Sequence, residues 1–295
     1  MQKSRITRYN TCARSLLSVC AGMIIALSAQ AAPEDRTMTS TWFNGNLQSG
    51  GLFQDRVQTR VNGATNPANV GEGDFTLEIW LKPSNENQGK GVTEGRAKNW
   101  YNGNIWLDRS TYYDPGWGGA LNRGRIVFNV RDQWQQSYNL IGRKDLRDGA
   151  WHFVSLVRQA NKLYIFVDGK REDSAAYVKA KANGSFKMPE TFSQNYPKSN
   201  PFHVLGVEKH DANVKIYPGY WGGMYDMRLS DIARYTDEAV VPKGPMATDE
   251  HTVLHWRLDE VTQAEDLTGH GNDGEYIKSA QGFPTVRSDS PFNGE

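Results

Sequence analysis

The chain has 295 residues, and its 34 Lys and Arg nearly balance its 33 Asp and Glu. Without a run of basic residues, this balance lacks the electrostatic footprint of a nucleic-acid-binding protein, so we expect no nucleic-acid partner. The only cysteines, Cys12 and Cys20, lie in a segment that we expect to be removed, which excludes disulfides, cysteine zinc sites and cysteine nucleophiles.

Residues 1–31 have the pattern of a secretory signal peptide. Four basic residues precede an apolar run over residues 16–27, and Ala29-Gln30-Ala31 forms a small-x-small cleavage site. The apolar run is shorter than the roughly 20 residues that a membrane-spanning helix needs, and no later segment approaches that length. We therefore expect a secreted or periplasmic protein, cleaved near Ala31 and Ala32, with no membrane span. Without those four basic residues, 30 of the 34 Lys and Arg remain against 33 Asp and Glu.

The remaining residues, 32–295, carry strand patterns and almost no helical periodicity. Apolar and polar residues alternate over residues 74–83, and Pro83 ends that segment. Only residues 231–239 favour a single helical turn, with Asp231 as its cap. Six further segments of similar length, bounded by Gly, Asn or Asp, predict strands at residues 125–130, 151–158, 162–170, 202–208, 221–230 and 253–260. Regularly spaced short strands predict an all-β sandwich or barrel.

The connections between these segments are of two kinds. Asp168-Gly169 is the strongest hairpin signal, and Ala160 with Asn161 forms a tight reversal between two strands. Residues 95–124 and 182–201 are rich in Gly, Asn and Pro and predict long connections, which in compact domains are usually functional or mobile.

Four stretches, in this order, resemble the laminin-G-like jellyroll of the concanavalin A-like lectin/glucanase superfamily: GDFTLEIWLKP, GRIVFNV, LRDGAWHFVSLVRQANKLYIFVDGK and YWGGMYDMRLSDIARYT. The most specific element is Asp148-Gly149-x-Trp151-His152, followed one strand later by Val167-Asp168-Gly169. The resemblance covers residues 50–240 and implies two antiparallel sheets packed face to face, with rim loops and a structural role for Trp151 and His152. It leaves the function open, because members bind sugars, bind proteins or cleave polysaccharides.

The segment 253–276, VLHWRLDEVTQAEDLTGHGNDGEY, usually opens such a unit but here follows the rest. Either the unit is circularly permuted, with the terminal segment closing the same sheets, or a second repeat has been truncated. We favour permutation, because too few residues follow Tyr276 to build a second core and domain termini often lie close together. We therefore predict one antiparallel jellyroll sandwich over residues 32–295, completed by a permuted C-terminal strand.

Aromatic residues gather between residues 99 and 119 and shortly afterwards. Aromatic faces stack on sugar rings, and neighbouring Asn, Asp and Arg can hydrogen-bond sugar hydroxyls. The alternative is that several of these rings pack inside the sandwich: Trp106, between Ile105 and Leu107, is expected on a strand, and Trp117 is a candidate for such packing. The candidate ligand-binding residues are Trp100, Tyr101, Tyr112, Tyr113 and Trp134. They favour a protein that binds an extracellular polysaccharide or glycan through aromatic rim loops.

Two other functions stay open. A polysaccharide lyase could use His203 as base, Tyr220 or Tyr225 as proton donor, and Arg125 or Lys209 to neutralise a uronate for β-elimination. A glycoside hydrolase is less favoured, because the sequence lacks the Glu-x-Asp-x-x-Glu strand of the glucanases with this fold. A protein-binding adhesion module would instead use the exposed aromatics as interface anchors.

A calcium site is also a candidate. Asp266, Asn272 and Asp273 place oxygen ligands on a Gly-rich loop, which suits Ca²⁺ in a structural role, with Asp226 as a further ligand. The alternative is an Asx-rich turn that satisfies its own backbone. The sequence names neither the sugar nor the oligomeric state.

Overall fold

The computed structural model describes residues 38–45, 55–61, 65–71, 73–110, 116–131, 136–160, 162–172, 202–209, 217–279, 282 and 284–293. Contacts divide the chain into two units, residues 1–36 and 37–295, and the first, with the expected signal peptide, lies outside the described residues. The described part of the second unit consists of strands and one 3-10 helix of 3 residues. No helix within those ranges is long and apolar enough to cross a membrane.

Sheet A has eight strands, all paired antiparallel. Its spatial order is β11 (Lys170–Arg171), β10 (Lys162–Val167), β9 (His152–Gln159), β3 (Phe75–Pro83), β13 (Trp221–Ser230), β1 (Ser40–Asn44) and β16 (Thr285–Arg287). The strand β14 (Thr252–Trp256) pairs with the second half of β13, beyond the part that pairs with β1.

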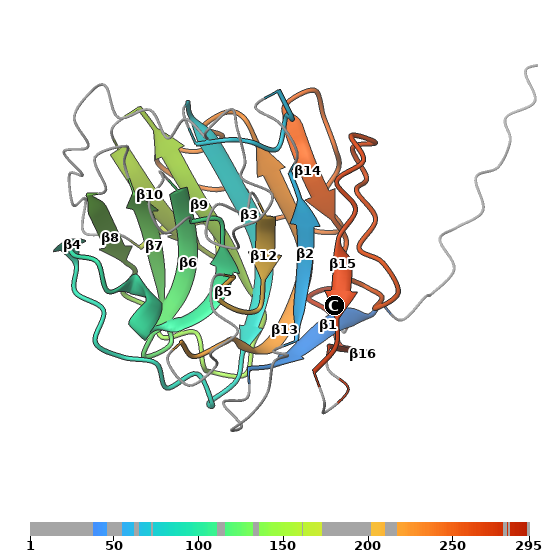
Figure 1. Ribbon diagram of the computed structural model, residues 1–295, viewed down its shortest axis with the longest axis horizontal. Coiled ribbons are helices and arrows are strands. Elements are labelled where there is room, and N and C mark those ends of the chain that lie inside the picture. Colours follow the sequence, from blue (N-terminus) through green and yellow to red (C-terminus); the bar gives the residue numbers. More distant parts are fainter. Residues whose placement is uncertain are drawn as a thin grey trace, which may run out of the picture. The chain divides into compact units, whose positions relative to one another are not determined.

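Sheet B also has eight antiparallel strands, which follow one another across Figure 1. Its order is β15 (Glu275–Ile277), β2 (Arg56–Arg60), β12 (Phe202–Leu205), β5 (Asn104–Asp108), β6 (Gly116–Asn122), β7 (Arg125–Arg131), β8 (Ser137–Ile141) and β4 (Gly95–Arg96). The 3-10 helix η1 (Trp100–Asn102) leads into β5.

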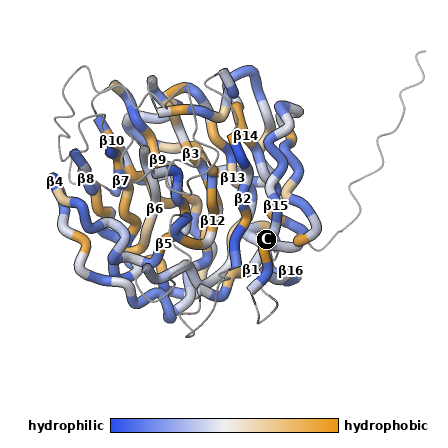
Figure 2. The backbone as a smooth tube through the Cα atoms, in the orientation of Figure 1, coloured by the Kyte–Doolittle hydropathy of each residue, from blue (hydrophilic) through white to orange (hydrophobic). Residues whose placement is uncertain are grey.

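The core lies between the two sheets, because alternate side chains of each strand point to one face. Phe75 of sheet A stacks against Trp117 of sheet B with ring centroids 4.7 Å apart, and Trp106 is fully buried nearby in the same cluster. The packing of Trp106 and Trp117 inside the sandwich, the alternative to ligand binding, is therefore confirmed. Figure 2 shows orange stretches on strands such as β3, whereas β2 is mostly blue.

The expected long connection over residues 95–124 is wrong. These residues contain β4, η1 and the hairpin of β5 and β6. The glycines of β6, which predict a loop, make room for large rings, since a Cβ on Gly119 would lie 2.3 Å from the Trp106 ring. The second expected connection, residues 182–201, lies outside the described residues.

The predicted hairpin turn at Asp168-Gly169 is confirmed, with φ of 50° and 81° as a type I′ turn requires. The helical turn expected over residues 231–239 is wrong, because this segment has no helical residues. Its backbone bonds to sheet A instead: Thr76 Oγ1 donates to the Ile232 carbonyl and accepts from the Arg234 N–H.

The C-terminal segment contributes to both sheets. Its strand β14 pairs with β13 in sheet A, β15 with β2 in sheet B, and β16 with β1 in sheet A. This is the arrangement that a permuted segment requires, and it gives the segment no separate core among the described residues. The prediction of an all-β, two-sheet antiparallel sandwich is confirmed.

Candidate functional site

The outer face of sheet A is covered. Along β3, Leu77 and Ile79 belong to the core, so Glu78 and Trp80 point away from it. Two later segments of the chain pack over that outer face. The apolar clusters there are Trp80, Phe153, Tyr225 and Met246 with Trp151 and Phe292, and Val157, Tyr164, Phe166 and Ala239 with Ala233 and Tyr235.

A buried ionic network fixes this cover. Glu78 is fully buried, and its carboxylate accepts hydrogen bonds from Arg228 Nε at 2.8 Å and from the Tyr235 hydroxyl at 2.7 Å. Burial raises the pKa of Tyr235, and the Glu78 carboxylate raises it further. Arg234 adds a two-pronged contact to Asp249 at 2.8 and 2.7 Å. Ionic hydrogen bonds and apolar contacts therefore both hold the covering segments on the outer face of sheet A.

The outer face of sheet B is polar. A single register row crosses all eight strands on this face, each residue opposite the next. This polar row consists of Glu275, Gln58, Val204, Asp108, Gly118, Asn129, Asn139 and Gly95. Its members point away from the core because their strand neighbours, such as Val57, Leu205 and Phe128, belong to it.

Two amide side chains dominate the centre of the polar row. Asn129 Nδ2 donates to Asn139 Oδ1 at 2.8 Å and to Ser137 Oγ at 2.7 Å, while Asn139 Nδ2 donates to the Thr93 carbonyl at 2.9 Å. Asn129 is only 1% exposed, yet its Oδ1 has no hydrogen-bond donor within the described part of the chain. A buried unpaired acceptor costs about 1–3 kcal/mol, so this atom is poised to accept a hydrogen bond.

The Trp100 side chain packs on this face of sheet B. Its ring lies over Gly118, where a Cβ would stand 2.8 Å from Trp100 Cη2. Trp100 is 6% exposed and packs with apolar side chains of the sheet, so the expectation of a ring open to ligand is wrong for Trp100. The small residues of β6 leave the indole a place on the sheet. Tyr101, beside it, is half-buried and packs edge to face on Tyr217 at 5.2 Å.

Three candidate aromatics lie outside the described residues: Tyr112, Tyr113 and Trp134. Gly116, the first residue of β6, lies opposite Arg131, the last residue of β7. The connections that carry the three aromatics in the sequence therefore join the sheet at neighbouring strand ends.

The residues proposed for a lyase do not form an accessible site. His203 is 1% exposed, points into the sandwich, and donates from Nε2 to the Ala68 carbonyl at 2.9 Å. Burial lowers the pKa of His203 well below its ordinary value. Tyr220 is fully buried, and its hydroxyl donates to a backbone carbonyl. Arg125 begins β7 on another part of the chain. His203 and Tyr220 are therefore buried and do not face a groove.

The residues proposed for calcium lie in a turn whose carboxylates accept hydrogen bonds from the turn itself. Asp266 accepts from Thr268 Oγ1 at 2.7 Å and from the Asn272 N–H at 3.1 Å, and Asp273 accepts from the Asp266 N–H at 2.7 Å. Asp226 is held separately by a buried histidine at 2.7 Å. Donor hydrogens occupy these carboxylates, so in this arrangement they do not fit Ca²⁺, which takes six to eight oxygen ligands. No group of three acidic or histidine residues in the described ranges converges as a metal site.

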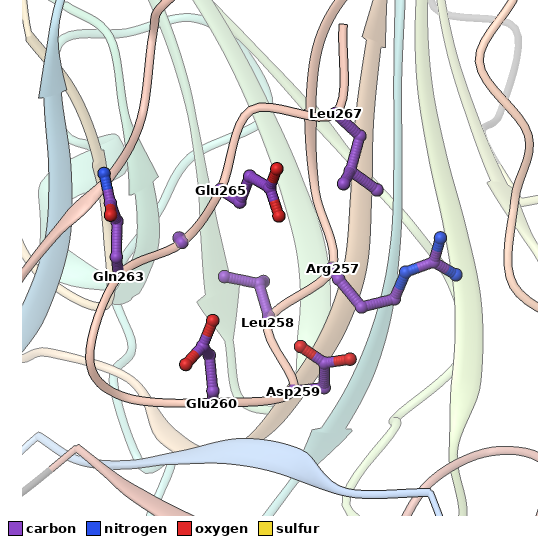
Figure 3. A pocket seen from close by; sticks show the side chains of 8 residues that line it. Arg257, Leu258, Asp259, Glu260, Gln263, Glu265 and Leu267 are labelled. Carbon is purple, nitrogen blue, oxygen red and sulfur yellow. The ribbon is translucent and has the colours of Figure 1, made fainter. Parts of the chain in front are cut away.

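A hollow of about 270 Å³ lies elsewhere, beside the C-terminal segment. Figure 3 shows Asp259, Glu260 and Glu265 around Leu258, all from one short stretch of chain. Burial raises the pKa of Asp259. The hollow has no aromatic lining residue, so it lacks the stacking surface that a sugar ring uses.

Sequence patterns missed the residues of the polar row. The one available signal was Asn129 inside the otherwise apolar RIVFNV strand, because Asn is depleted in strands. Gln58, Asp108 and Asn139 each lie on a strand of five residues. The neighbours of these strands are set by long-range pairing, which leaves no local pattern in the sequence.

The fold is a two-sheet sandwich with one covered outer face and one polar outer face. The chain belongs to the concanavalin A-like lectin/glucanases superfamily, whose Laminin_G_3 family model matches residues 56–205. No curated protein matches the chain.

Several solved structures are similar to the chain at low identity. A candidate carbohydrate binding protein from Bacteroides ovatus ATCC 8483 is 14% identical, with a TM-score of 0.47, over 85% of this chain and 59% of that one. The heptameric SAP-like pentraxin from Limulus polyphemus is 10% identical over 68% and 78%, with a TM-score of 0.40. Domains LG4-5 of the mouse laminin alpha1 chain are 14% identical over 70% and 47%, with a TM-score of 0.38. The chain thus spans less than two thirds of the Bacteroides protein, and these likenesses say nothing of its own ligand.

Proposed function

We propose that this protein binds a carbohydrate, an extended polysaccharide chain, across the outer face of sheet B. The observation that carries the proposal is Asn129 Oδ1, a buried acceptor without a donor in the described residues, at the centre of a polar row that crosses the whole sheet. A sugar hydroxyl would supply the missing donor. The outer face of sheet A offers no equivalent, because apolar clusters and the Glu78 network cover it.

The chemistry of the polar row suits sugar hydroxyls. The Gln58 amide can donate and accept hydrogen bonds in the plane of a sugar ring, and Asn129 Oδ1 can accept one. Tyr101 and Tyr217, both half-buried at the η1 side, add aromatic surface of the kind on which apolar sugar faces stack. At Gly118 the row has no side chain of its own, and the Trp100 ring lies over this position.

The dimensions favour a chain over a single sugar. Gln58 on β2 and Asn139 on β8 are separated by five strand intervals, which at the usual strand spacing is roughly 24 Å. That distance is several times the length of one sugar ring, and Val204, Asp108, Asn129 and Asn139 along it are at most 1% exposed. The signal-peptide pattern of residues 1–31 supports the further proposal that the protein is exported and meets its polysaccharide outside the cytoplasm.

Affinity electrophoresis through gels cast with different polysaccharides tests the proposal. We expect retarded migration in at least one gel without degradation of the polysaccharide. We further expect Asn129→Ala to weaken binding by about tenfold, the effect of losing one good hydrogen bond.

Asn139→Ala is the matched control. It removes comparable internal hydrogen bonds from the same row, but both side-chain atoms of Asn139 already have partners in the protein. Both variants should lose similar thermal stability, and only Asn129→Ala should lose binding. No retardation in any gel, or equal losses in the two variants, would contradict the proposal.

A further inference from the structure

We infer that the polysaccharide held on sheet B is anionic, carrying carboxylate or sulfate groups, and that Arg60 recognises them. The inference rests on the proposed function and adds a specificity-determining residue to it. It is carried by the placement of guanidinium groups beside the polar row and by the charges around them.

Arg60 lies next to the polar row. It is on β2, two residues beyond Gln58 and on the same face, opposite Phe202 of β12. On β7, Arg131 stands two residues beyond Asn129 in the same direction, opposite Gly116. Four strand intervals separate β2 from β7, so the two guanidinium-bearing positions are roughly 19 Å apart. A glycan lying along the polar row would run beside both of them.

Arg60 has no acidic partner among the described residues. It is half-buried, and its Nε, like that of Arg56, is buried without an acceptor. Arg56 provides the contrast, on the same strand and the same face at the other side of Gln58. Burial lowers the pKa of Arg56, and the nearby Glu275 carboxylate raises it, so its charge has a neighbour of opposite sign within the protein.

The polar row has two acidic members, Glu275 on the strand beside β2 and Asp108 two strands away from β2, and Asp108 already accepts hydrogen bonds. Asp108 is fully buried, and its carboxylate accepts the Ser110 N–H at 2.8 Å and the Lys209 N–H at 3.0 Å. The next residue, Arg109, is also fully buried, with Nη2 bonded to Asn69 Oδ1 but Nε and Nη1 without acceptors. The Arg109 guanidinium therefore places a buried positive charge next to the Asp108 carboxylate.

The positive charges near Arg109 also affect the pKa of His203. Burial lowers it first, and the charges of Arg109 and Lys209 lower it further. A guanidinium binds carboxylate and sulfate oxygens through two parallel N–H donors, and partial burial strengthens that contact relative to bulk water. An anionic group on the glycan would supply the acceptor that Arg60 lacks.

Matched polysaccharides test this inference. Dissociation constants would be measured by calorimetry for polygalacturonate and its fully methyl-esterified form, and for dextran sulfate and dextran. We expect the charged polymer of at least one pair to bind more than tenfold tighter than its neutral counterpart. The pair that shows the preference tells carboxylate from sulfate recognition, and higher salt should reduce the preference through screening.

Arg60→Gln and Arg56→Gln separate the two arginines. Arg60→Gln should abolish the preference for the charged polymer, Arg60→Lys should retain part of it, and Arg56→Gln should leave it within about twofold. None should unfold the protein, which thermal melts would verify. Equal binding of charged and neutral polymers, or equal effects of the two Gln variants, would overturn the inference while leaving the proposed function standing. Binding of neither charged nor neutral polymer would overturn both.

Discussion

His152 Nδ1 lies 2.8 Å from Asp168 Oδ2, which joins the two halves of the sequence element that resembles the laminin-G-like jellyroll. On its other side, His152 Nε2 lies 2.9 Å from Asp148 Oδ1. The imidazole is 97% buried as a side chain by these contacts, whereas the carboxylates stay partly exposed. The relationship ties the turn before β9 to the hairpin after β10, which is a structural role and not a catalytic one.

The contacts of His152 with Asp168 and Asp148, which we call the His152 clamp, should make stability depend on pH. Burial lowers the pKa of His152, but hydrogen bonds to Asp168 and Asp148 outweigh burial and raise it overall. A histidine with a raised folded pKa contributes fully below its unfolded pKa, about 6.5, and loses that contribution as pH rises through the folded pKa. His152→Gln should therefore lower Tm by roughly 3–6 °C at pH 6 and by less at pH 9.

His251→Gln is the control for this prediction. His251 also contacts an aspartate, Asp231, at 3.1 Å, but both side chains are about half exposed, so the pair contributes little. Differential scanning fluorimetry at the two pH values compares the variants. A loss of Tm in His152→Gln that does not change with pH would rule out the charged clamp.

A second buried group gives a pH dependence of the same sign, over a more acidic range. Burial raises the pKa of Asp55 to about 7, although the Asn44 N–H, 2.5 Å from Oδ2, acts in the other direction. The folded protein then holds a proton that the unfolded chain releases near pH 4, so stability falls as pH rises from about 4 to 7.

Asp55→Asn keeps the shape of the side chain and removes this titration. Relative to the native protein, the variant should gain on the order of 2–4 kcal/mol of unfolding free energy between pH 5 and pH 8. Urea denaturation at both pH values measures the change. A constant difference between the two proteins across this range would show that Asp55 does not bind a proton in the folded state.

The packing of Trp100 on β6 is a further testable feature. Gly118→Ala would place a Cβ 2.8 Å from Trp100 Cη2 and 2.9 Å from the Leu107 carbonyl oxygen. We expect a loss of about 1–3 kcal/mol from overpacking, and about 3–5 kcal/mol for Trp100→Ala from the cavity it leaves. Gly73→Ala is the control, since a Cβ there meets nothing within 4 Å.

Chemical denaturation of these three variants measures the effect. If Trp100→Ala unfolded at the same denaturant concentration as the native protein, the ring would not be part of the packed face. The sequence alone placed Trp100 among exposed ligand-binding aromatics, because its Asn and Gly neighbours are typical of loops.

Local sequence patterns were sufficient to predict a strand where one face of that strand is apolar. The alternation in residues 74–83 and the Asp168-Gly169 turn predicted β3 and the hairpin of β10 and β11 correctly. The strand β6 was not predicted, because its glycines carry no side chains that could show an alternating pattern. Glycine is required there because the Trp106 and Trp100 rings, from other segments, leave no room for a Cβ.

The polar row shows why the site was harder to predict than the fold. Asn129 and Asn139 come together through the pairing of β7 with β8, and Gln58 joins them only through four more strands. Each is an ordinary polar residue in its own stretch of sequence. Their common face is a product of sheet register, which a one-residue slip would destroy.

The central claim is that a polysaccharide lies across the outer face of sheet B. Side-chain amide resonances in a ¹H–¹⁵N spectrum, followed during titration with an oligosaccharide of the polymer that retards the protein, test it most directly. We predict that the Asn129 and Gln58 amides shift, whereas that of Gln263, bonded to Asp273 in the C-terminal segment, does not. Shifts confined to Gln263 and the surrounding segment 257–267, with Asn129 and Gln58 unchanged, would contradict the account.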